Sequence, residues 1–412
     1  MQHSRRRIYR RRRILVFGTA AVVLGAGIYL PTTLLAPVKP IDAIAVRSAE
    51  IAPVDVPVAW PSYGASAIGA VGYPAVLEAA GSAEPLPIAS ITKVITALVA
   101  LEAKPLEPGA PGPTITFDAA DAALSANYRA VQGKVAPMPT GSALSQLDTM
   151  KVVLVVSANN YAEAFADWAF GSREGYIAAV DAWLDRNGLD DTTIVEPTGI
   201  DPGNVSTASD LVDLGKLALA DPIVSEIVKL PSVSYPRVGN YANTNELLGI
   251  DGVDGIKTGT LDPAGSNLLF SADYAVGDST VTLVGVVLGS RDHDAIFPAV
   301  SSLLDSAEAG FRQVTLVKAG QAFATYSTAW GESADAVARA DVTAVFWSEV
   351  TIESALSAAP LTLAPKGSDA GSIVFTAGEQ RITVPLVLDT AITDPGPWWR
   401  LGHPLDAFGI AG

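Results

Sequence analysis

The sequence lacks cysteine altogether, and histidine occurs only as His3, His293 and His403 among its 412 residues. The absence of cysteine excludes disulfides, zinc–thiolate sites and thiol catalysis. The three histidines are widely separated, which leaves little room for a histidine metal cluster or a Ser-His-Asp triad. We therefore expect no metal site in this protein.

Basic residues are scarce after the first 13 positions. The formal net charge is −16, and removing the seven positive charges of Arg5–Arg7 and Arg10–Arg13 leaves −23 for the rest of the chain. Such an acidic body offers no electrostatic footprint for nucleic acid, so we expect no nucleic-acid partner. Charged residues make up 17% of the chain and hydrophobic ones 49%, which excludes a largely disordered protein. The length is sufficient for two domains with sizeable cores.

An uncharged apolar run, residues 14–35, follows the arginines directly. About 20 apolar residues suffice to cross a bilayer as a helix, and preceding arginines favour a cytoplasmic N-terminus. We therefore predict a basic cytoplasmic segment at 1–13, a transmembrane anchor at 14–36 and an extracytoplasmic remainder, in a single-pass protein of the cell membrane. The alternative is a secreted protein released by signal-peptide cleavage, for which Ala43-Ile44-Ala45 fits the site but lies late.

The rest of the chain predicts a linker and two folded domains. Residues 37–59 are Pro-rich and suit a linker or stalk, and residues 65–80 suggest a hairpin around Gly72-Tyr73-Pro74. We expect strands and loops at 114–150, two strands at 266–274 and 280–288, and helices at 147–170 (interrupted at 157–160), 177–186 (closed by Gly188), 209–220 (with a Ser/Asp cap) and 294–311. Helices between an early hairpin and late antiparallel strands predict an α+β domain at 60–314.

The tail at 315–412 has short β-prone runs separated by turn residues, which predict a small all-β domain. The runs are residues 342–347, 350–352, 361–363, 372–375 and 381–388.

Residues 88–101 form the stretch around which the chemistry is organised. The stretch is apolar nearly all round, which is typical of a helix buried in a core. Ser90 and Lys93 are three apart and therefore share one face of that helix. A lysine in such surroundings must be solvated, paired or neutral, because burying an unpaired ammonium is costly. A neutral amine beside a hydroxyl is a general base beside a nucleophile.

Two further motifs follow in order: Ser157-x-Asn159 and Lys257-Thr258-Gly259. Taken singly, the first fits a helix cap and the second a lysine that guards an edge strand. The three motifs together, in this order on an α+β protein, resemble the signature of active-site serine penicillin-recognising enzymes.

Longer stretches narrow the resemblance. Residues 89–93, 157–162, 196–201 and 253–260 are similar to D-alanyl-D-alanine carboxypeptidases, the low-molecular-mass penicillin-binding proteins of peptidase family S11. The likeness covers about residues 60–314. It implies a penicillin-binding, serine β-lactamase-like domain, an antiparallel sheet with a helical cluster. The implied activity removes the terminal D-alanine from peptidoglycan stem peptides ending in D-Ala-D-Ala through a Ser90 acyl-enzyme. β-Lactams would inhibit covalently, and no cofactor or metal would be needed.

The resemblance also implies roles for eight residues. Ser90 would be the nucleophile, Lys93 would take its proton, and Ser157 would relay a proton to the leaving amine. Asn159 would bind the substrate amide and hold Lys93, while Lys257 and Thr258 would bind a substrate carboxylate. Gly259 would let a peptide lie against the strand edge, and the backbone N–H groups of Ser90 and Thr260 would form the oxyanion hole.

The chain departs from the family pattern at two places. Asn160 stands where the family usually has aspartate, and residues 394–400 are too rich in Pro and Gly for the amphipathic C-terminal helix that anchors many members. We interpret Asp292, His293 and Asp294 as a solvated helix start without a catalytic role, and Trp398 and Trp399 as core or domain-interface residues.

Two alternatives to the carboxypeptidase remain. A class A β-lactamase shares the motif types but needs a deacylating glutamate in a Glu-x-x-Leu-Asn setting, whereas Glu196 is followed by Pro197-Thr198-Gly199. A non-catalytic cell-wall scaffold with the same fold is the second alternative. Intact Ser90, Lys93 and Lys257 argue against it, because a scaffold has no chemical need for all three.

Overall fold

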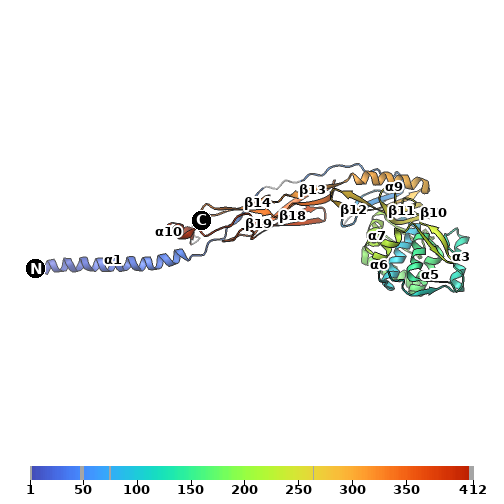
Figure 1. Ribbon diagram of the computed structural model, residues 1–412, viewed down its shortest axis with the longest axis horizontal. Coiled ribbons are helices and arrows are strands. Elements are labelled where there is room, and N and C mark those ends of the chain that lie inside the picture. The colour runs from blue at the N-terminus through green and yellow to red at the C-terminus, as the bar shows by residue number, and fades with distance from the viewer. Residues whose placement is uncertain (1, 47–50, 74–75, 263, 408–412) are drawn as a thin grey trace. The chain divides into compact units, whose positions relative to one another are not determined.

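The computed structural model describes residues 2–46, 51–73, 76–262 and 264–407. The chain divides into two compact units (Figure 1). Unit 1 contains residues 1–53, 314–344 and 350–412, and unit 2 contains residues 54–313 and 345–349. Both units therefore combine segments that are far apart in the sequence.

Unit 2 is built on a five-stranded antiparallel sheet with the order β10-β11-β12-β2-β3. The strands are β2 Ala65–Ala70, β3 Val76–Gly81, β10 Val253–Leu261, β11 Gly265–Val276 and β12 Ser279–Ser290. The helix α9, His293–Glu308, packs on β11 and β12 on one face, and a cluster of helices covers the other face (Figure 1). Because both faces are covered, β11 and β12 consist largely of apolar residues rather than of an alternating pattern.

The helical cluster surrounds α2, whose residues from Thr92 to Leu101 are all buried. Its helices are α2 Thr92–Ala103, α3 Ala119–Ala130, α4 Gln146–Lys151, α5 Asn159–Phe170, α6 Arg173–Asn187, α7 Ala208–Ala220 and α8 Pro222–Val228. A 3-10 turn, η1 (Ala89–Ile91), precedes α2, and a π-helical segment, η2 (Val152–Val156), follows α4. Both carry residues of the site into position. Three short strand pairs complete the unit: β4 Leu86–Pro87 with β7 Val205–Ser206, β5 Thr114–Thr116 with β6 Ala143–Ser145, and β8 Ser232–Tyr235 with β9 Gly239–Ala242.

Most of the elements predicted for this unit are present. The hairpin forms as β2 and β3, although Pro74 of its predicted turn lies outside the described residues. Gly188 ends α6 in the left-handed conformation, with φ 67°. The prediction of strands and loops alone at 114–150 was wrong, because α3 forms there. The Asp118 carboxylate accepts hydrogen bonds from the backbone N–H groups of Ala120 and Asp121. The Asp121 carboxylate accepts one from the backbone N–H of Asp118, which completes a capping box.

The start of α7 also differs from the prediction. Thr207, not the Ser209/Asp210 pair, is its N-cap, and the Thr207 hydroxyl accepts from the backbone N–H of Asp210 at 3.2 Å.

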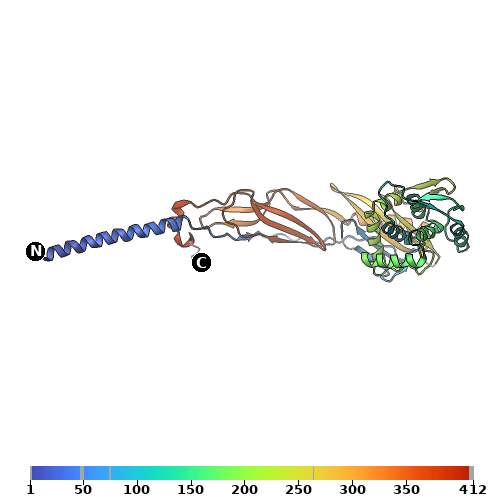
Figure 2. The same ribbon diagram turned by 90° about the horizontal axis from the view of Figure 1, so that it is seen from below.

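Unit 1 contains a six-stranded antiparallel sheet with the order β1-β14-β15-β19-β18-β17 (Figure 2). The strands are β1 Ala43–Ala45, β14 Ala322–Ser327, β15 Ser333–Ala338, β17 Ile352–Ser357, β18 Asp369–Ala377 and β19 Gln380–Leu388. Along β19 the buried residues alternate as Val384, Leu386 and Leu388, the period expected of a strand with one buried face. Two further strands, β13 Phe311–Val317 and β16 Val342–Trp347, pair with each other.

The predicted β-rich tail is confirmed in kind but not in detail. The strands β13, β14 and β15 had no predicted counterpart, and residues 361–363 form no strand, since only Leu361 makes an isolated bridge, to Ile41. The segment interpreted as a linker at 37–59 contributes β1 to the sheet, and Ile51 bridges Ile352; residues 47–50 lie outside the described part. A short helix, α10 Gly396–Gly402, forms in the Pro- and Gly-rich stretch, followed by α11 Pro404–Ala407.

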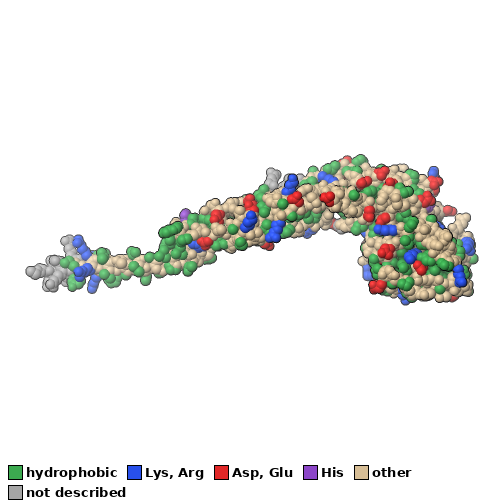
Figure 3. Space-filling view, in the orientation of Figure 1, with side chains coloured by type: hydrophobic (Ala, Val, Ile, Leu, Met, Phe, Trp, Pro, Cys, Tyr) green, Lys and Arg blue, Asp and Glu red, His purple; other side chains and the backbone are tan. Residues whose placement is uncertain are grey.

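The helix α1 runs from Gln2 to Leu34 and is long and apolar enough, by length and composition, to cross a membrane between Ile8 and Leu34. On the face seen in Figure 3, hydrophobic side chains follow a group of basic side chains near the N-terminal end of the helix. The most apolar 18-residue window of this span is not buried within the protein. Such a surface is compatible with lipid contact.

Candidate active site

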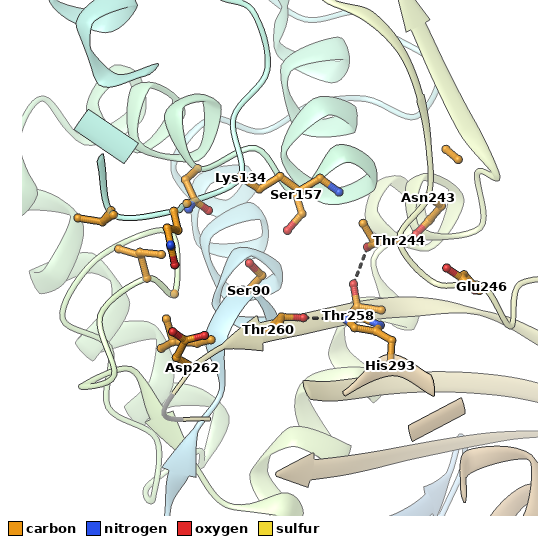
Figure 4. Close-up of a pocket in the computed structure, with 18 residues that line it drawn as sticks. Ser90, Lys134, Ser157, Asn243, Thr244, Glu246, Thr258, Thr260, Asp262 and His293 are labelled. Atoms are coloured by element: carbon orange, nitrogen blue, oxygen red, sulfur yellow. Dashed lines mark hydrogen bonds between the residues drawn. The ribbon is translucent and has the colours of Figure 1, made fainter. Parts of the chain in front are cut away.

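A cleft of about 590 Å³ lies between strand β10 and the helical cluster of unit 2. Ser90, Ser157, Asn159, Thr258 and Thr260 all line it, although they come from three separate parts of the sequence. The hydroxyl groups of Ser90 and Ser157 point into the same space (Figure 4). The structure thus brings the three sequence motifs together at one cleft.

Ser90 lies in η1, one residue before the cap of α2, and Lys93 lies in the first turn of α2. The Lys93 Nζ atom is 2.9 Å from Ser90 Oγ, 2.6 Å from Asn159 Oδ1 and 2.5 Å from the carbonyl oxygen of Thr198. Two of these three neighbours are carbonyl oxygens, which can only accept hydrogen bonds. A neutral amine has two N–H groups and one lone pair. When its N–H groups donate to the two carbonyl oxygens, its lone pair is left facing the Ser90 hydroxyl.

The surroundings of Lys93 favour that neutral form. Its side chain is completely buried, and burial lowers its pKa to about 7. The carboxylate of Glu196 opposes this lowering, whereas the charge of Lys134 adds to it. An amine with a pKa near neutrality is well matched to accept a proton at physiological pH.

Ser157 and Asn159 are placed by a break between two helical segments. The π turn η2 ends at Ser157, whose φ of 65° lies in the left-handed region, and α5 begins at Asn159. A serine in this region costs of order 1 kcal/mol, and such strain is typical of functional sites. The break turns Ser157 into the cleft while Asn159 reaches Lys93.

The turn after Glu196 holds the third partner of Lys93. One carboxylate oxygen of Glu196 accepts from the backbone N–H and the hydroxyl of Thr198, at 2.8 and 2.7 Å. The other accepts from the Gly199 N–H at 2.5 Å and from Asn204 Nδ2 at 2.9 Å. These bonds aim the Thr198 carbonyl oxygen at Lys93. Gly199 has a φ of 81°, and a Cβ there would lie 1.8 Å from the carbonyl oxygen of Ala89, so only glycine fits.

Asn160, the residue that departs from the family pattern, is fully buried and fully engaged. Its Oδ1 accepts from the backbone N–H of Ala136 at 3.1 Å, and its Nδ2 donates to the Ala136 carbonyl at 2.9 Å and to Ser125 Oγ at 3.0 Å. An amide carries both a donor and an acceptor, which matches the two backbone groups of one residue. Asn160 therefore fixes the loop that carries Lys134 along one side of the cleft.

Strand β10 supplies the opposite wall. Lys257 is buried and donates to the carbonyl of Thr258 at 3.1 Å, and burial with the nearby charges of Lys93 and Lys134 holds its pKa well below the usual value. The Thr258 hydroxyl contacts that of Thr244. Gly259 lets the strand approach η1, since a Cβ there would lie 2.8 Å from the Ile88 carbonyl oxygen and 3.3 Å from the Ser90 nitrogen.

Two residues to which the sequence analysis gave no role in the site, Lys134 and His293, also line the cleft. The side chain of Lys134 is exposed by surface area, yet partial desolvation of its amine lowers its pKa. His293 Nε2 lies 2.7 Å from the Thr260 hydroxyl (Figure 4), and its pKa is lowered mainly by burial. Asp292 caps α9, as the predicted helix start requires, but His293 is not simply solvated. Its position depends on how α9 packs against β10, which no local pattern reports.

Comparison with known proteins defines the class of the chain. It shares its fold with a peptidoglycan synthesis regulatory factor (PBP3) from Streptococcus pneumoniae, at a TM-score of 0.60 and 23% identity over 82% of this chain and all of that one. The chain also shares its fold with penicillin binding protein 5 from Haemophilus influenzae. The TM-score is 0.57 and the sequence identity 21%, over 84% of this chain and all of that one. The predicted fold class is thereby confirmed.

A family model described as D-alanyl-D-alanine carboxypeptidase, peptidase S11, matches residues 72–292, more than half of the chain. The chain therefore belongs to the peptidase S11 family, as its motifs indicate. D-alanyl-D-alanine carboxypeptidase DacC of Escherichia coli is 31% identical over 264 residues, 63% of this chain and 64% of DacC. A D-alanyl-D-alanine endopeptidase of Pseudomonas aeruginosa is 31% identical over 207 residues, 48% of this chain and 63% of that protein. The chain thus spans less than two thirds of either relative.

Proposed function

We propose that the protein is a serine-type D-alanyl-D-alanine carboxypeptidase that removes the terminal D-alanine from peptidoglycan stem peptides through a Ser90 acyl-enzyme. The single observation that carries this proposal is the placement of Lys93. Its amine is buried, has a pKa of about 7 and lies 2.9 Å from the hydroxyl of Ser90. Ser90 itself lines the cleft. A buried lysine with no chemical task would be an unfavourable element of a core.

In the proposed reaction, the lone pair of Lys93 takes the Ser90 proton as Ser90 Oγ attacks the carbonyl carbon between the two D-alanines. The negative charge on the carbonyl oxygen is bound by the backbone N–H groups of Ser90 and Thr260. Collapse of this tetrahedral species breaks the C–N bond, and the leaving amine receives a proton through Ser157. Water then hydrolyses the ester, and Lys93 again serves as the base.

Substrate binding is proposed to use both walls of the cleft. Asn159 would donate from its Nδ2 to the substrate amide, because its Oδ1 is already engaged with Lys93. The terminal carboxylate would lie among Thr258, Thr260 and the buried amine of Lys257, whose protonated form it would favour, next to His293. Gly259 would let the peptide lie against the edge of β10, and its lack of a side chain also brings β10 close to Ser90.

The domain and membrane assignments from the sequence also remain proposals. We propose that residues 60–314 are the catalytic domain and 315–412 an accessory β-rich domain, and that the helix within 14–36 anchors the protein with its N-terminus in the cytoplasm and the cleft outside. The long apolar helix and the basic residues before it support this topology.

The β-lactamase alternative has no support at the site. A deacylating glutamate must present a free carboxylate to water, whereas both Glu196 oxygens are occupied by donors of the 198–204 turn. Endopeptidase action on cross-links is a closer competitor, since endopeptidases occur among the similar proteins. It uses the same chemistry and differs only in the leaving amine.

The test is an intact-mass time course of the full chain in detergent, mixed with benzylpenicillin, beside Ser90→Ala. A one-to-one adduct that persists for many minutes, and is missing in Ser90→Ala, is expected. Rapid clearance of the adduct would identify a β-lactamase, and no adduct would favour the scaffold. Incubation with an acyl-D-Ala-D-Ala peptide should release D-alanine in the wild type only. Cleavage of cross-linked dimers without release of terminal D-alanine would instead assign the endopeptidase activity.

A further inference from the structure

Lys134 lines the cleft but has no part in the proposed reaction. Its side chain lies beside that of Ser157 (Figure 4). Among the residues that the structure describes, none forms a hydrogen bond or an ion pair with its amine, although the acidic residues Glu246 and Asp262 also line the cleft. A lysine that enters a cleft without a partner of its own is available to a ligand.

The backbone around Lys134 is held in place by hydrogen bonds. The N–H of Gly133 donates to the carbonyl of Tyr128 at 2.7 Å, and the carbonyl of Lys134 accepts from the N–H of Asn159 at 2.7 Å. Two residues further along, the side-chain amide of Asn160 binds both backbone groups of the loop. The direction in which the Lys134 side chain leaves the loop is therefore fixed before any ligand binds, which lowers the cost of binding one.

The same segment passes directly beside the group that is proposed to bind the substrate amide. A Cβ on Gly133 would lie 2.6 Å from the Nδ2 atom of Asn159, so the backbone at this position is in contact with that donor. A peptide held by Asn159 would therefore lie next to the residue that follows Gly133. That residue is Lys134.

Three other basic side chains share the electrostatic surroundings of the Lys134 amine. Its charge lowers the pKa values of Lys93, Lys257 and His293, and only at His293 does Glu246 act in the opposite direction. Partial desolvation also lowers the pKa of Lys134 itself. Basic groups that converge on one cleft repel one another when charged, and a bound anion relieves both this repulsion and the lost hydration.

We propose that Lys134 is a specificity-determining residue whose ammonium group binds a carboxylate of the substrate. This inference rests on the proposed function, because that function supplies a peptide with a free carboxylate. Two carboxylates could meet the ammonium. One is that of the terminal D-alanine, proposed to lie near Thr258, and the other is an acidic group in the acyl part of the peptide, on the side held by Asn159.

The test uses the full chain in detergent with Ser90→Ala, so that peptides bind without acylation. Lys134→Met keeps the length of the side chain and removes the charge, and Lys134→Arg keeps the charge. Lys104→Met is the matched control, because Lys104 is exposed and lies outside the cleft. Ligand-observed NMR measures the dissociation constants of acetyl-L-Ala-D-Ala-D-Ala, of its C-terminal amide, and of the same peptide with succinyl in place of acetyl.

Lys134→Met is expected to weaken binding of the carboxylate that Lys134 contacts by about 10–100-fold, the loss typical of a hydrogen bond to a charged group. A loss for the acetyl peptide but not for its amide identifies the terminal carboxylate. A loss confined to the succinyl peptide identifies an acyl carboxylate. Lys134→Arg should restore most of the affinity, and Lys104→Met should change none.

Equal losses for all three peptides would mean that Lys134 only supports the loop, and no loss for any of them would mean that it binds no carboxylate. Either result overturns the inference. Release of D-alanine by the chain that retains Ser90 tests the proposed function separately, so a chain that releases D-alanine without dependence on Lys134 keeps that function. If none of the three peptides binds to Ser90→Ala, the inference and the proposed function both fail.

Discussion

The interiors of the two units differ in kind. Among the described residues of unit 1, the buried polar or charged side chains are Thr33, Thr328 and Arg400, and the core of its sheet is apolar. Unit 2 buries two lysines, a glutamate and several asparagines around its cleft, as Lys93, Lys257, Glu196, Asn159 and Asn160 illustrate. Burial of such groups is unfavourable unless each has a partner, and here each of them takes part in a hydrogen bond.

The two kinds of interior constrain the sequence differently. An apolar sheet requires side chains of suitable size and alternation, whereas a polar interior requires particular atoms at particular positions. Substitutions in unit 2 should therefore change chemistry and stability together. Substitutions in unit 1 should change stability alone.

The largest effect is expected from Lys93→Met, which keeps the volume of the side chain and removes the base. Loss of a general base slows reactions by about 10²–10⁴-fold, so acylation by benzylpenicillin should fall by that order. Folding also deprotonates Lys93 between its folded pKa of about 7 and its ordinary value of 10.5, so the unfolded state binds the extra proton and stability rises with pH in that window. The variant should lose this part of the rise in urea titrations at pH 7–10. Acylation at the wild-type rate would refute the role of Lys93.

Glu196→Gln should have the next largest effect. The Glu196 charge raises the pKa of Lys93, so its removal should move the acid limb of the acylation–pH profile to lower pH. Glutamine also offers a single oxygen to donors that now use two, and an unsatisfied buried group costs about 1–3 kcal/mol of unfolding free energy.

Glu102→Gln is the matched control for this prediction. Glu102 pairs with Arg186 on the surface and is more than half exposed, so its loss should change stability by less than about 1 kcal/mol. A Glu196→Gln profile that moves to higher pH, or does not move, would contradict the electrostatic coupling.

Asn160→Asp restores the usual family residue and should nevertheless weaken this protein. A carboxylate cannot donate to the carbonyl of Ala136 or to Ser125, so unfolding free energy should drop by about 1–3 kcal/mol at neutral pH. Because burial raises the pKa of a carboxyl, protonation at lower pH should recover part of the loss. The matched control is Asn240→Asp, which should leave the free energy of unfolding nearly unchanged because Asn240 is exposed. Acylation should slow by less than about tenfold, since general positioning rather than the base is affected.

The smallest effect on activity is expected from a large change in unit 1. Phe375→Ala in β18 removes a buried aromatic ring and should cost about 3–5 kcal/mol of stability. Calorimetry should show a transition shifted to lower temperature, while the rate of penicillin acylation stays within twofold of the wild type. If the rate of acylation fell together with the transition temperature, the activity of unit 2 would depend on the packing of unit 1.

The sequence predicted the site best where its residues are close together in the chain. Ser90 and Lys93 share one helical turn, and Ser157 and Asn159 flank one helix start, so short motifs suffice to pair them. The place of Lys134 and His293 in the site was not predicted. The position of Lys134 depends on a loop that Asn160 holds by hydrogen bonds, and the position of His293 depends on where α9 lies relative to β10. The close approach of Gly259 to Ile88 and Ser90 could not be predicted, because a motif gives the residue type but not the direction in which a Cβ would point.

The same limit applies to the fold. Long apolar strands such as β11 and β12 were predictable, because their pattern is continuous and bounded by turns. The strand β1 was hidden in a Pro-rich stretch, since its partner β14 lies nearly 280 residues further on. The helix α10 formed against expectation because Arg400 and Trp399 bind it to the rest of unit 1, which outweighs weak local propensity.

The division of the chain between the units has a consequence for biosynthesis. The sheet of unit 1 contains β1, near the start of the chain, and β17, β18 and β19, near its end. A ribosome releases these strands at opposite times. The sheet therefore stays incomplete until nearly the whole polypeptide has been synthesised, whereas the five strands and the helices of unit 2 have all emerged by residue 308. The protein thus assembles from its middle outward, and β1 is among the last segments to find a partner.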